Sequence, residues 1–313
     1  MNIQRYASEL RNFGLRFLLN YHVVGRWRGS RYKQRVILNY ITKKCINPLP
    51  RQNLQTFQED NSPFEPDVQP IWVCWWQGEE QMPKIVKACY HSLLQHRNGH
   101  PVVLLSKENY QDYVSLPTHI EKLHSKGVIT MTHLSDILRI ALLSKYGGLW
   151  MDATLFLTGD LPAVFPRFFT LKQQCKDESY VSDYRWSGYC IGGSVDNCLF
   201  KSVYDACVSY WDSHDRLIDY YFLDYIIAAL YNSNEFFREI IDSVPYSNPD
   251  VHYILFRMNE PYDAEAFERI CRETYIHKLS WKGQMCEKTK DTDSMTYYGY
   301  VINQDKDSGS KKV

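Results

Sequence analysis

Short apolar runs separated by amphipathic stretches begin at residue 71. The run 71–76 (IWVCWW) is apolar at every position, which is typical of a strand buried on both faces. After Pro83, apolar residues recur at the three- and four-residue spacing of one helix face. The same alternation then predicts a strand over 101–105, a helix over 132–146 and a strand over 149–151. This order predicts an α/β fold with a Rossmann-like, mostly parallel sheet flanked by helices.

The pattern is less regular toward the end of the chain. Residues 186–193 (WSGYCIGG) predict a further strand, and 202–211 and 218–232 predict helices. Residues 48–70 contain five prolines among polar residues and predict a linker. We therefore expect a main domain over 71–302, followed by a disordered polar tail over 303–313.

Charge separates the first 47 residues from the rest. The net charge of the chain is zero, yet residues 1–51 contain eleven Lys or Arg and a single acid, Glu9. Apolar residues such as Phe17, Leu19 and Trp27 alternate with these basic residues. This pattern predicts a basic amphipathic helical arm over 1–47 and leaves three interpretations open. The arm lies on an anionic membrane surface, packs on the main domain, or binds nucleic acid.

Composition places the protein in a reducing compartment. The nine cysteines include no CxxC pair, and no signal peptide or long apolar run is present. We expect a cytoplasmic protein, with the arm as a means of attachment to the inner face of the cytoplasmic membrane.

A carboxylate follows the third predicted strand. Asp152 comes directly after a buried run, and in a parallel sheet the carboxyl ends of the strands form the ligand-binding edge. An acid in this position must be solvated, paired or bound to a metal ion. Asp136 and Arg139 share one side of the preceding helix, where they either form an ordinary i,i+3 salt bridge or hold a ribose and a phosphate. Dinucleotide, P-loop and nucleophile-elbow motifs are absent from the sequence.

The stretch 135–154 (SDILRIALLSKYGGLWMDAT) resembles the signature of DXD-containing sugar transferases, S-D-x-x-R-x-x-x-L-x-x-x-G-G-x-x-x-D-x-D. The pattern is most similar to the bacterial capsular polysaccharide synthesis protein family, and is related to Och1-like mannosyltransferases and to the catalytic domains of glucosylating toxins. Weaker similarity extends from 71–83 to 277–282. The resemblance implies a GT-A fold and a hexosyltransferase that retains anomeric configuration. The donor would be a UDP- or GDP-sugar, with UDP favoured, and the acceptor a lipid-linked or polysaccharide hydroxyl; nucleic acid is not an expected partner.

The resemblance also implies roles for individual residues. Thr154 replaces the second acid of the motif, so a Mn²⁺ or Mg²⁺ cofactor is expected with one carboxylate fewer than usual. A competing interpretation is a non-catalytic nucleotide- or glycan-binding module that has lost its metal site. The implied metal ligands are Asp152, Thr154 and His277, and the implied catalytic residues are Asp152, His277 and Asp224, with Asp219 as a further acceptor-side acid. The implied nucleotide-sugar contacts are Trp76, Gln77, Asp136, Arg139, Gly148, Lys278, Ser280 and Trp281.

Overall fold

The computed structural model describes residues 3–49, 68–174, 180–195 and 198–308. Most of the predicted linker over 48–70 lies outside these residues, as does the end of the predicted tail, 309–313.

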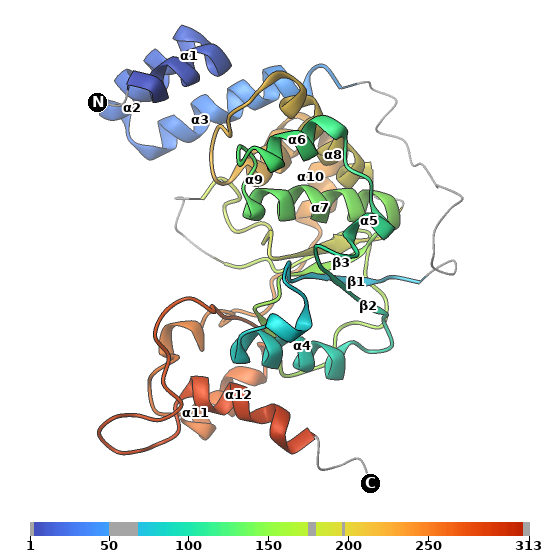
Figure 1. Cartoon of the computed structure of the whole chain (residues 1–313), viewed down its shortest axis with the longest axis vertical. Coiled ribbons are helices and arrows are strands. Elements are labelled where there is room, and N and C mark those ends of the chain that lie inside the picture. Colours follow the sequence, from blue (N-terminus) through green and yellow to red (C-terminus); the bar gives the residue numbers. More distant parts are fainter. Residues whose placement is uncertain (1–2, 50–67, 175–179, 196–197, 309–313) are drawn as a thin grey trace.

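A five-stranded sheet with the order β2-β1-β3-β6-β5 forms the centre of the molecule (Figure 1). β1 pairs in parallel with β2 and with β3, whereas β6 runs antiparallel to β3 and to β5. Four of the five strands therefore point the same way, which confirms the predicted mostly parallel sheet. The strands are β1 (Ile71–Cys74), β2 (Val102–Leu105), β3 (Gly148–Met151), β5 (Phe169–Thr170) and β6 (Cys190–Gly193).

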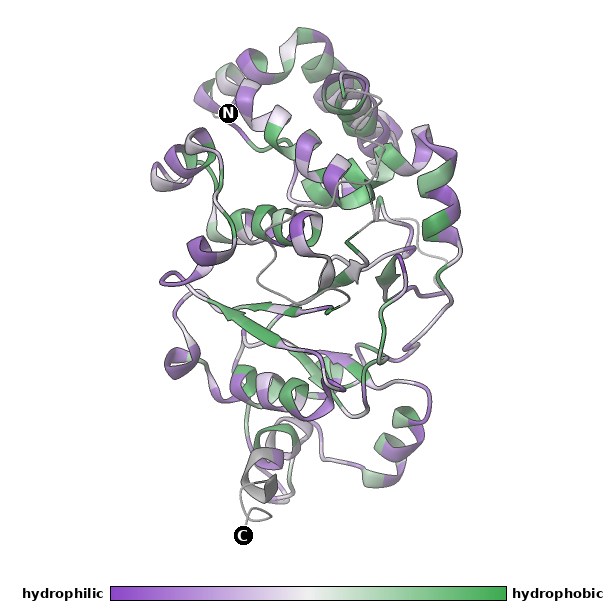
Figure 2. Cartoon of the chain, turned by 90° about the vertical axis from the view of Figure 1, so that its right-hand side faces the viewer, coloured by the Kyte–Doolittle hydropathy of each residue, from purple (hydrophilic) through white to green (hydrophobic). Residues whose placement is uncertain are grey.

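Strand alternation divides the apolar core into two layers. In β1, Trp72 faces one layer, while Ile71 and Val73 face the other. The first layer lies under α7 (Met131–Tyr146), α8 (Cys198–Ser213) and α9 (Phe222–Ser233), and the second under α4 (Lys84–His96) and α12 (Tyr297–Ser308). Figure 1 shows these helices on opposite sides of the sheet, and in Figure 2 apolar colour follows the strands.

The predicted elements of the first half are present, with boundaries shifted by a few residues. The predicted strand 71–76 ends at Cys74, and the helix predicted over 132–146 extends from Met131 to Tyr146. The strand predicted over 186–193 is shorter and antiparallel, because β6 returns beside β3 after a loop. Elements without a clear pattern in the sequence are β4 (Leu155–Leu157), β7 (Ile276–Lys278), α5 (Tyr110–Tyr113), α6 (Thr118–Ser125), α10 (Glu235–Asp242), α11 (Ala264–Cys271), and the short 3₁₀ turns η4 (Glu79–Gln81) and η5 (Leu255–Arg257).

The C-terminal helix α12 continues to Ser308, into the segment predicted to be a disordered tail. Tyr297 and Val301 of this helix are buried, so the start of the helix is anchored in the second core layer. The polar sequence after residue 302 does not indicate a helix. The packing of Tyr297 and Val301 accounts for the continuation of α12 beyond that residue.

The N-terminal arm is helical, as predicted, and packs on the main domain. Its inner face buries Phe13, Phe17, Ile37 and Ile41 in the first core layer, against α8 and α9. Figure 1 shows the arm at one end of the molecule and α11 and α12 at the other. The arm consists of α1 (Ile3–Leu18), the π-helical turn η1 (Leu19–Val24), α2 (Gly25–Arg28), α3 (Ser30–Ile41) and the π-helical turn η2 (Thr42–Ile46).

Candidate active site

Asp152 lies at the carboxyl edge of the sheet, immediately after β3. The carboxyl ends of β1 and β2 meet at the same edge because the three strands are parallel. The backbone N–H of Asp152 donates to the carbonyl of Tyr189, just before β6, and this bond fixes the carboxylate at the end of the strand.

Four charged side chains alternate in sign across this edge. Arg139 Nη1 forms an ion pair with Asp136 Oδ1 at 3.3 Å, and Arg139 Nη2 donates to Asp152 Oδ1 at 3.3 Å. Lys278 Nζ then donates to Asp152 Oδ2 at 2.7 Å and to Thr154 Oγ1 at 2.8 Å. We call Asp136, Arg139, Asp152 and Lys278 the charge chain. The structure thus brings together five of the residues predicted for the site, four charged and one hydroxyl.

The charge of Asp152 is stabilised by its neighbours. Burial alone would raise the pKa of Asp152, but the positive charges of Lys278 and Arg139 outweigh it and hold this pKa below its usual value. The indole Nε1 of Trp150 adds a hydrogen bond to Oδ1 at 3.1 Å. Asp152 is therefore an anion at neutral pH and cannot act as a general acid there.

A buried histidine supports the other end of the charge chain. Trp211 Nε1 donates to His133 Nε2 at 3.0 Å, so the neutral imidazole carries its proton on Nδ1. This Nδ1 lies 3.7 Å from Asp136 Oδ2. His133 therefore lies beside the Asp136 carboxylate, on α7 as is Arg139.

His277 lies apart from the charge chain. In β7 successive side chains face opposite sides, so Lys278 reaches Asp152 while His277 enters the second core layer. The His277 ring is completely buried, packs against Phe267 and pairs through Nε2 with Thr158 Oγ1 at 3.1 Å. Burial lowers the pKa of His277 to about 4, so it is neutral at physiological pH. We therefore assign His277 a structural role in place of the expected metal-binding and catalytic roles.

The residues expected to bind a divalent cation do not form a set that suits one. Mg²⁺ and Mn²⁺ favour several carboxylate or carbonyl oxygens in octahedral geometry. Here one carboxylate and one hydroxyl oxygen are both hydrogen bonded to the ammonium of Lys278, and the imidazole of His277 faces elsewhere. Within the described residues, no group of three or more His, Cys, Asp or Glu side chains could hold a metal ion.

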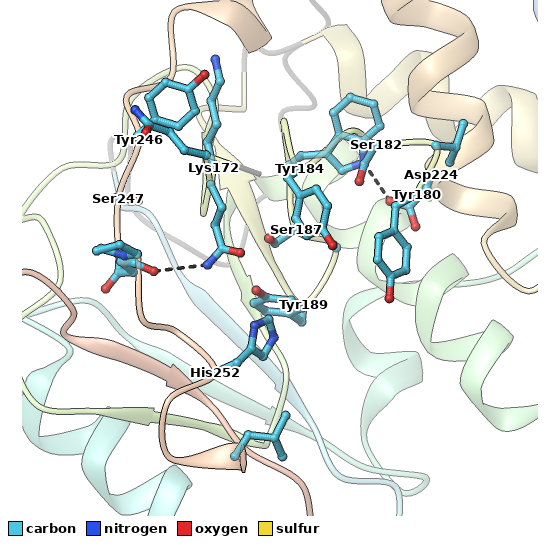
Figure 3. A pocket seen from close by; sticks show the side chains of 18 of the residues that line it. Lys172, Tyr180, Ser182, Tyr184, Ser187, Tyr189, Asp224, Tyr246, Ser247 and His252 are labelled. Atoms are coloured by element: carbon cyan, nitrogen blue, oxygen red, sulfur yellow. Dashed lines mark hydrogen bonds between the residues drawn. The ribbon is translucent and has the colours of Figure 1, made fainter. Parts of the chain in front are cut away.

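A large pocket adjoins the charge chain across the segment just before β6. Its volume is about 1170 Å³, and Gly188 in its wall passes within 3.2 Å of the Arg139 guanidinium, measured from an ideal Cβ position. Figure 3 shows Tyr189 and His252 close together in this pocket, which Tyr184, Tyr180 and Asp224 also line. The charge of Lys278 acts on His252, whose pKa is lowered mainly by burial. The pocket is thus a largely aromatic cavity beside the charge chain.

Asp224, at the start of α9, is the predicted acid that faces this pocket. Its Oδ1 accepts a hydrogen bond from Trp186 Nε1 at 2.8 Å (Figure 3). Burial raises the pKa of Asp224 to about 6, and the negative charge of Asp136 contributes. Asp219 instead accepts from the backbone N–H of Tyr221 and shapes the turn that precedes α9.

The raised pKa of Asp224 predicts a pH-dependent gain in stability for Asp224→Asn. The folded-state pKa of about 6 exceeds the ordinary value of 3.8, so the carboxyl favours folding most below pH 3.8 and loses this contribution as pH rises through 6. We expect Asp224→Asn to unfold with a free energy about 1–2 kcal/mol higher than the wild type at pH 8, and to show a clearly smaller gain at pH 4.5. Urea denaturation at both pH values measures this difference; an equal gain at both would contradict it.

Aromatic side chains gather beyond the carboxyl end of β1. Trp75 and Trp281 meet edge to face with ring centroids 5.8 Å apart, and Trp281 is 47% exposed. Trp76 packs instead against Tyr110, at 5.3 Å. Trp76 and Trp281 thus lie near the sheet edge where the sequence predicted nucleotide contacts, and Trp75 is an additional aromatic residue there.

Three further residues were predicted to contact the nucleotide-sugar. Gln77 is exposed beyond β1, and Ser280 Oγ accepts from the backbone N–H of Lys282 in a turn after β7. Gly148 begins β3, at the end of the strand opposite Asp152, and packs against Pro70. Gly148 therefore belongs to the fold and not to the ligand-binding edge.

Four residues that the sequence did not single out contact or adjoin the charge chain. They come from separate elements, and none of them occupies one of the fixed positions of the motif at 135–154. Only their residue type indicated a functional role. Aromatic and imidazole groups are common in sugar-binding sites, but they also fill cores. They are Trp150, Tyr189, His133 and His252.

Comparison with known proteins gives the family. A model of the capsular polysaccharide synthesis protein family matches residues 26–301, and the chain belongs to this family. This result confirms the family predicted from the motif at 135–154, and with it the predicted class of enzyme, a glycosyltransferase. A search of curated protein sequences gave no match.

The solved structures that resemble the chain include two glycosyltransferases. PaToxG glycosyltransferase is 15% identical, with a TM-score of 0.39, over 81% of this chain and 99% of that one. The apo structure of the bifunctional glycosyltransferase WbbM is 10% identical, with a TM-score of 0.43, over 79% of this chain and 51% of that one. This chain thus spans about half of the WbbM chain.

Proposed function

We propose that the protein transfers a sugar from a nucleotide-diphosphate sugar to a hydroxyl group of a capsular or other cell-surface polysaccharide intermediate. The observation that carries this proposal is the charge chain at the carboxyl edge of the sheet, where an α/β fold binds its ligands. Arg139 and Asp136 would hold the sugar and ribose hydroxyls, and Lys278 would lie beside the diphosphate. A UDP-sugar is favoured over a GDP-sugar by the resemblance of the motif.

The proposed reaction retains the configuration of the anomeric carbon. The bond from this carbon to the diphosphate oxygen breaks, and its electron pair leaves with the diphosphate. The acceptor oxygen forms the new bond on the same face, and its proton passes to the departing diphosphate. Asp152 is held as an anion by Lys278 and Arg139, so its role here is to orient these two cations toward the donor.

The aromatic pocket is the proposed site of the acceptor. Its volume of about 1170 Å³ suits a saccharide of more than one unit, and tyrosine and tryptophan rings form stacking surfaces for sugar rings. Asp224 on its wall can accept a hydrogen bond from an acceptor hydroxyl. The position of Gly188 beside Arg139 supports an acceptor site next to the proposed donor sugar.

A thermal-shift screen of nucleotide sugars tests the proposed function. A ligand present at one hundred times its dissociation constant stabilises a protein by about 2.7 kcal/mol, which corresponds to about 5 °C for a domain of this size. We expect such a shift with at least one UDP- or GDP-sugar, and slow hydrolysis of the same compound in the absence of acceptor. No shift with any nucleotide sugar, with or without Mn²⁺, would contradict the proposal.

A non-catalytic binding module is the alternative function. Thr154, in place of the second acid of the motif, is the observation that favours it. A module would give the thermal shift but would neither hydrolyse the nucleotide sugar nor transfer its sugar to an extract of polysaccharide intermediates. The two functions therefore differ in turnover and not in binding.

We further propose that the outer face of the arm binds an anionic membrane surface. Residues 15–28 form one helical segment between Gly14 and Gly29, each at a φ of 81°. Apolar residues recur every fourth position on the face opposite the buried Phe17, and they are strongly exposed. This row consists of Leu15 (61% exposed), Leu19 (48%), Val23 (54%) and Trp27 (86%).

Charge complementarity supports an anionic lipid surface as the occupant. Arg16, Arg26 and Arg28 are exposed on the same helical segment. The single acid among residues 1–51, Glu9, is buried and paired with Arg5. An exposed apolar row with basic flanks is typical of helices that lie in the interface of anionic membranes. None of the helices described in the structure combines the length and the apolar character needed to cross a bilayer.

Substitution of the exposed row is expected to weaken vesicle binding. The double variant Leu19→Ser/Trp27→Ser removes two exposed side chains, each contributing about 1–2 kcal/mol on insertion, so its partition onto phosphatidylglycerol vesicles should fall at least about tenfold. The control is Val164→Ser, at a residue that is 72% exposed outside the arm. Cosedimentation measures the partition; equal binding of the double variant and the control would contradict the proposal, and steeply salt-dependent RNA or DNA binding would favour the nucleic-acid interpretation.

A further inference from the structure

The ammonium of Lys278 occupies the position between the two motif residues at 152 and 154. Its Nζ lies 2.7 Å from Asp152 Oδ2 and 2.8 Å from Thr154 Oγ1. The side chains of Lys278 and Asp152 are 19% and 30% exposed, so the pair is neither sealed in the core nor free in solvent. These two oxygens belong to the positions at which the resembled motif carries its two acids.

β-strand geometry fixes Lys278 in this position. β7 pairs with β4 so that Lys278 lies opposite Leu155, the residue after Thr154. The backbone N–H of Leu279 also donates to the carbonyl of Thr154 at 2.8 Å. The stem of Lys278 therefore starts from a paired strand, and its ammonium also lies 5.1 Å from the ring centroid of Tyr189.

The ammonium retains capacity for a ligand. An ammonium group has three N–H donors, and two of them are used by Asp152 and Thr154. Within the described part of the chain, the third donor has no acceptor at hydrogen-bond distance. It is available for an oxygen of a phosphate at the sheet edge.

We propose that Lys278 is the resident cation of the active site, which stabilises the diphosphate leaving group in place of a divalent metal ion. This inference rests on the proposed function and adds a catalytic residue and a metal-independent mechanism to it. Thr154 is then suited to its position, since a hydroxyl accepts from the ammonium without adding negative charge. A second carboxylate would instead give the site a net charge that attracts a metal ion.

The proposed step requires no further reactant. As the bond between the anomeric carbon and the diphosphate breaks, negative charge grows on the departing phosphate oxygen. The third N–H of Lys278 donates to this oxygen, and the proton of the acceptor hydroxyl completes the leaving group. Preorganised cations of this kind lower the barrier because they need no rearrangement during the reaction.

Binding of UDP and of uridine to Lys278→Met tests the role of the charge. We expect the wild type to bind UDP equally well, within about twofold, in EDTA and in Mn²⁺. Lys278→Met should bind UDP at least about tenfold more weakly while uridine, which lacks the diphosphate, binds as before. Lys201→Met is the matched control, since Lys201 pairs with Asp205 at the same 2.7 Å on α8, away from the site. Calorimetric titration gives the affinities, and thermal unfolding shows that each variant is folded.

Conversion of the site to a metal site provides a second test. Thr154→Asp/Lys278→Ala restores the second acid and removes the ammonium, and we expect this variant, unlike the wild type, to bind Mn²⁺ alone in electron paramagnetic resonance titrations. Wild-type UDP binding that is lost in EDTA and restored by Mn²⁺ would overturn the inference but leave the proposed function intact. Absence of UDP binding under all conditions would overturn both.

Discussion

Asp152→Asn is expected to lower the rate of nucleotide-sugar hydrolysis about 10²- to 10³-fold, the usual effect of removing one preorganised electrostatic contact. The amide keeps the shape of the side chain and can still accept from Trp150, so the fold should persist. The change removes the negative charge that positions both Arg139 and Lys278. Without it the two cations repel each other, and the donor loses its oriented contacts.

Initial hydrolysis rates with a UDP-sugar, measured without acceptor, check this expectation. Asp205→Asn is the matched control, because Asp205 is also paired with a lysine at 2.7 Å but lies on α8 outside the site. We expect the control to hydrolyse the donor at the wild-type rate. If Asp152→Asn and the control differ by less than about threefold, the charge chain is not the catalytic site.

Gly148→Ala is expected to have the largest effect on stability. Gly148 has a φ of +84°, and an added Cβ would lie 2.0 Å from the carbonyl oxygen of Pro70. The chain at this point forms the start of β3, between β1 and β6, so neither backbone can move away without breaking the sheet. We expect a loss of about 4 kcal/mol or more in the free energy of unfolding, enough to prevent accumulation of folded protein.

Gly127→Ala separates the clash from the backbone strain. Gly127 also has a positive φ, +71°, but no atom lies within 4 Å of its added Cβ. This control should lose only about 1–2 kcal/mol, the cost of the left-handed conformation for a residue with a side chain. Urea denaturation of both variants measures the difference; equal losses would show that the contact with Pro70 has no effect.

The buried inner face of the arm limits the variants that can test its binding to a membrane. The inner face of the arm buries Ile37, Ile41 and Cys45 in the same core layer as α9. Deletion of residues 1–45 would therefore expose this part of the core and destabilise the protein. Substitutions in the exposed row of Leu15, Leu19, Val23 and Trp27 avoid this problem, because those side chains have few contacts to lose.

The sequence by itself determined the order of the first strands and helices and the family. Local patterns can be recognised without knowledge of tertiary contacts. They include the apolar runs at 71–76 and 149–151 and the motif at 135–154. The same patterns placed Asp152 at the carboxyl edge and Asp136 beside Arg139. The direction of β6 and the pairing of β4 with β7 depend on contacts between distant segments, which periodicity does not record.

Tertiary structure decided the chemistry of the site. His277 and Lys278 are neighbours in the sequence, and either could have approached Asp152. The register of β7 against β4 turned Lys278 toward Asp152 and Thr154 and buried His277 in the core. Because side chains alternate along a strand, a register shifted by one residue would have exchanged the two. The sequence therefore specified an acid at position 152, and the pairing of two short strands determined that its partner is an ammonium group.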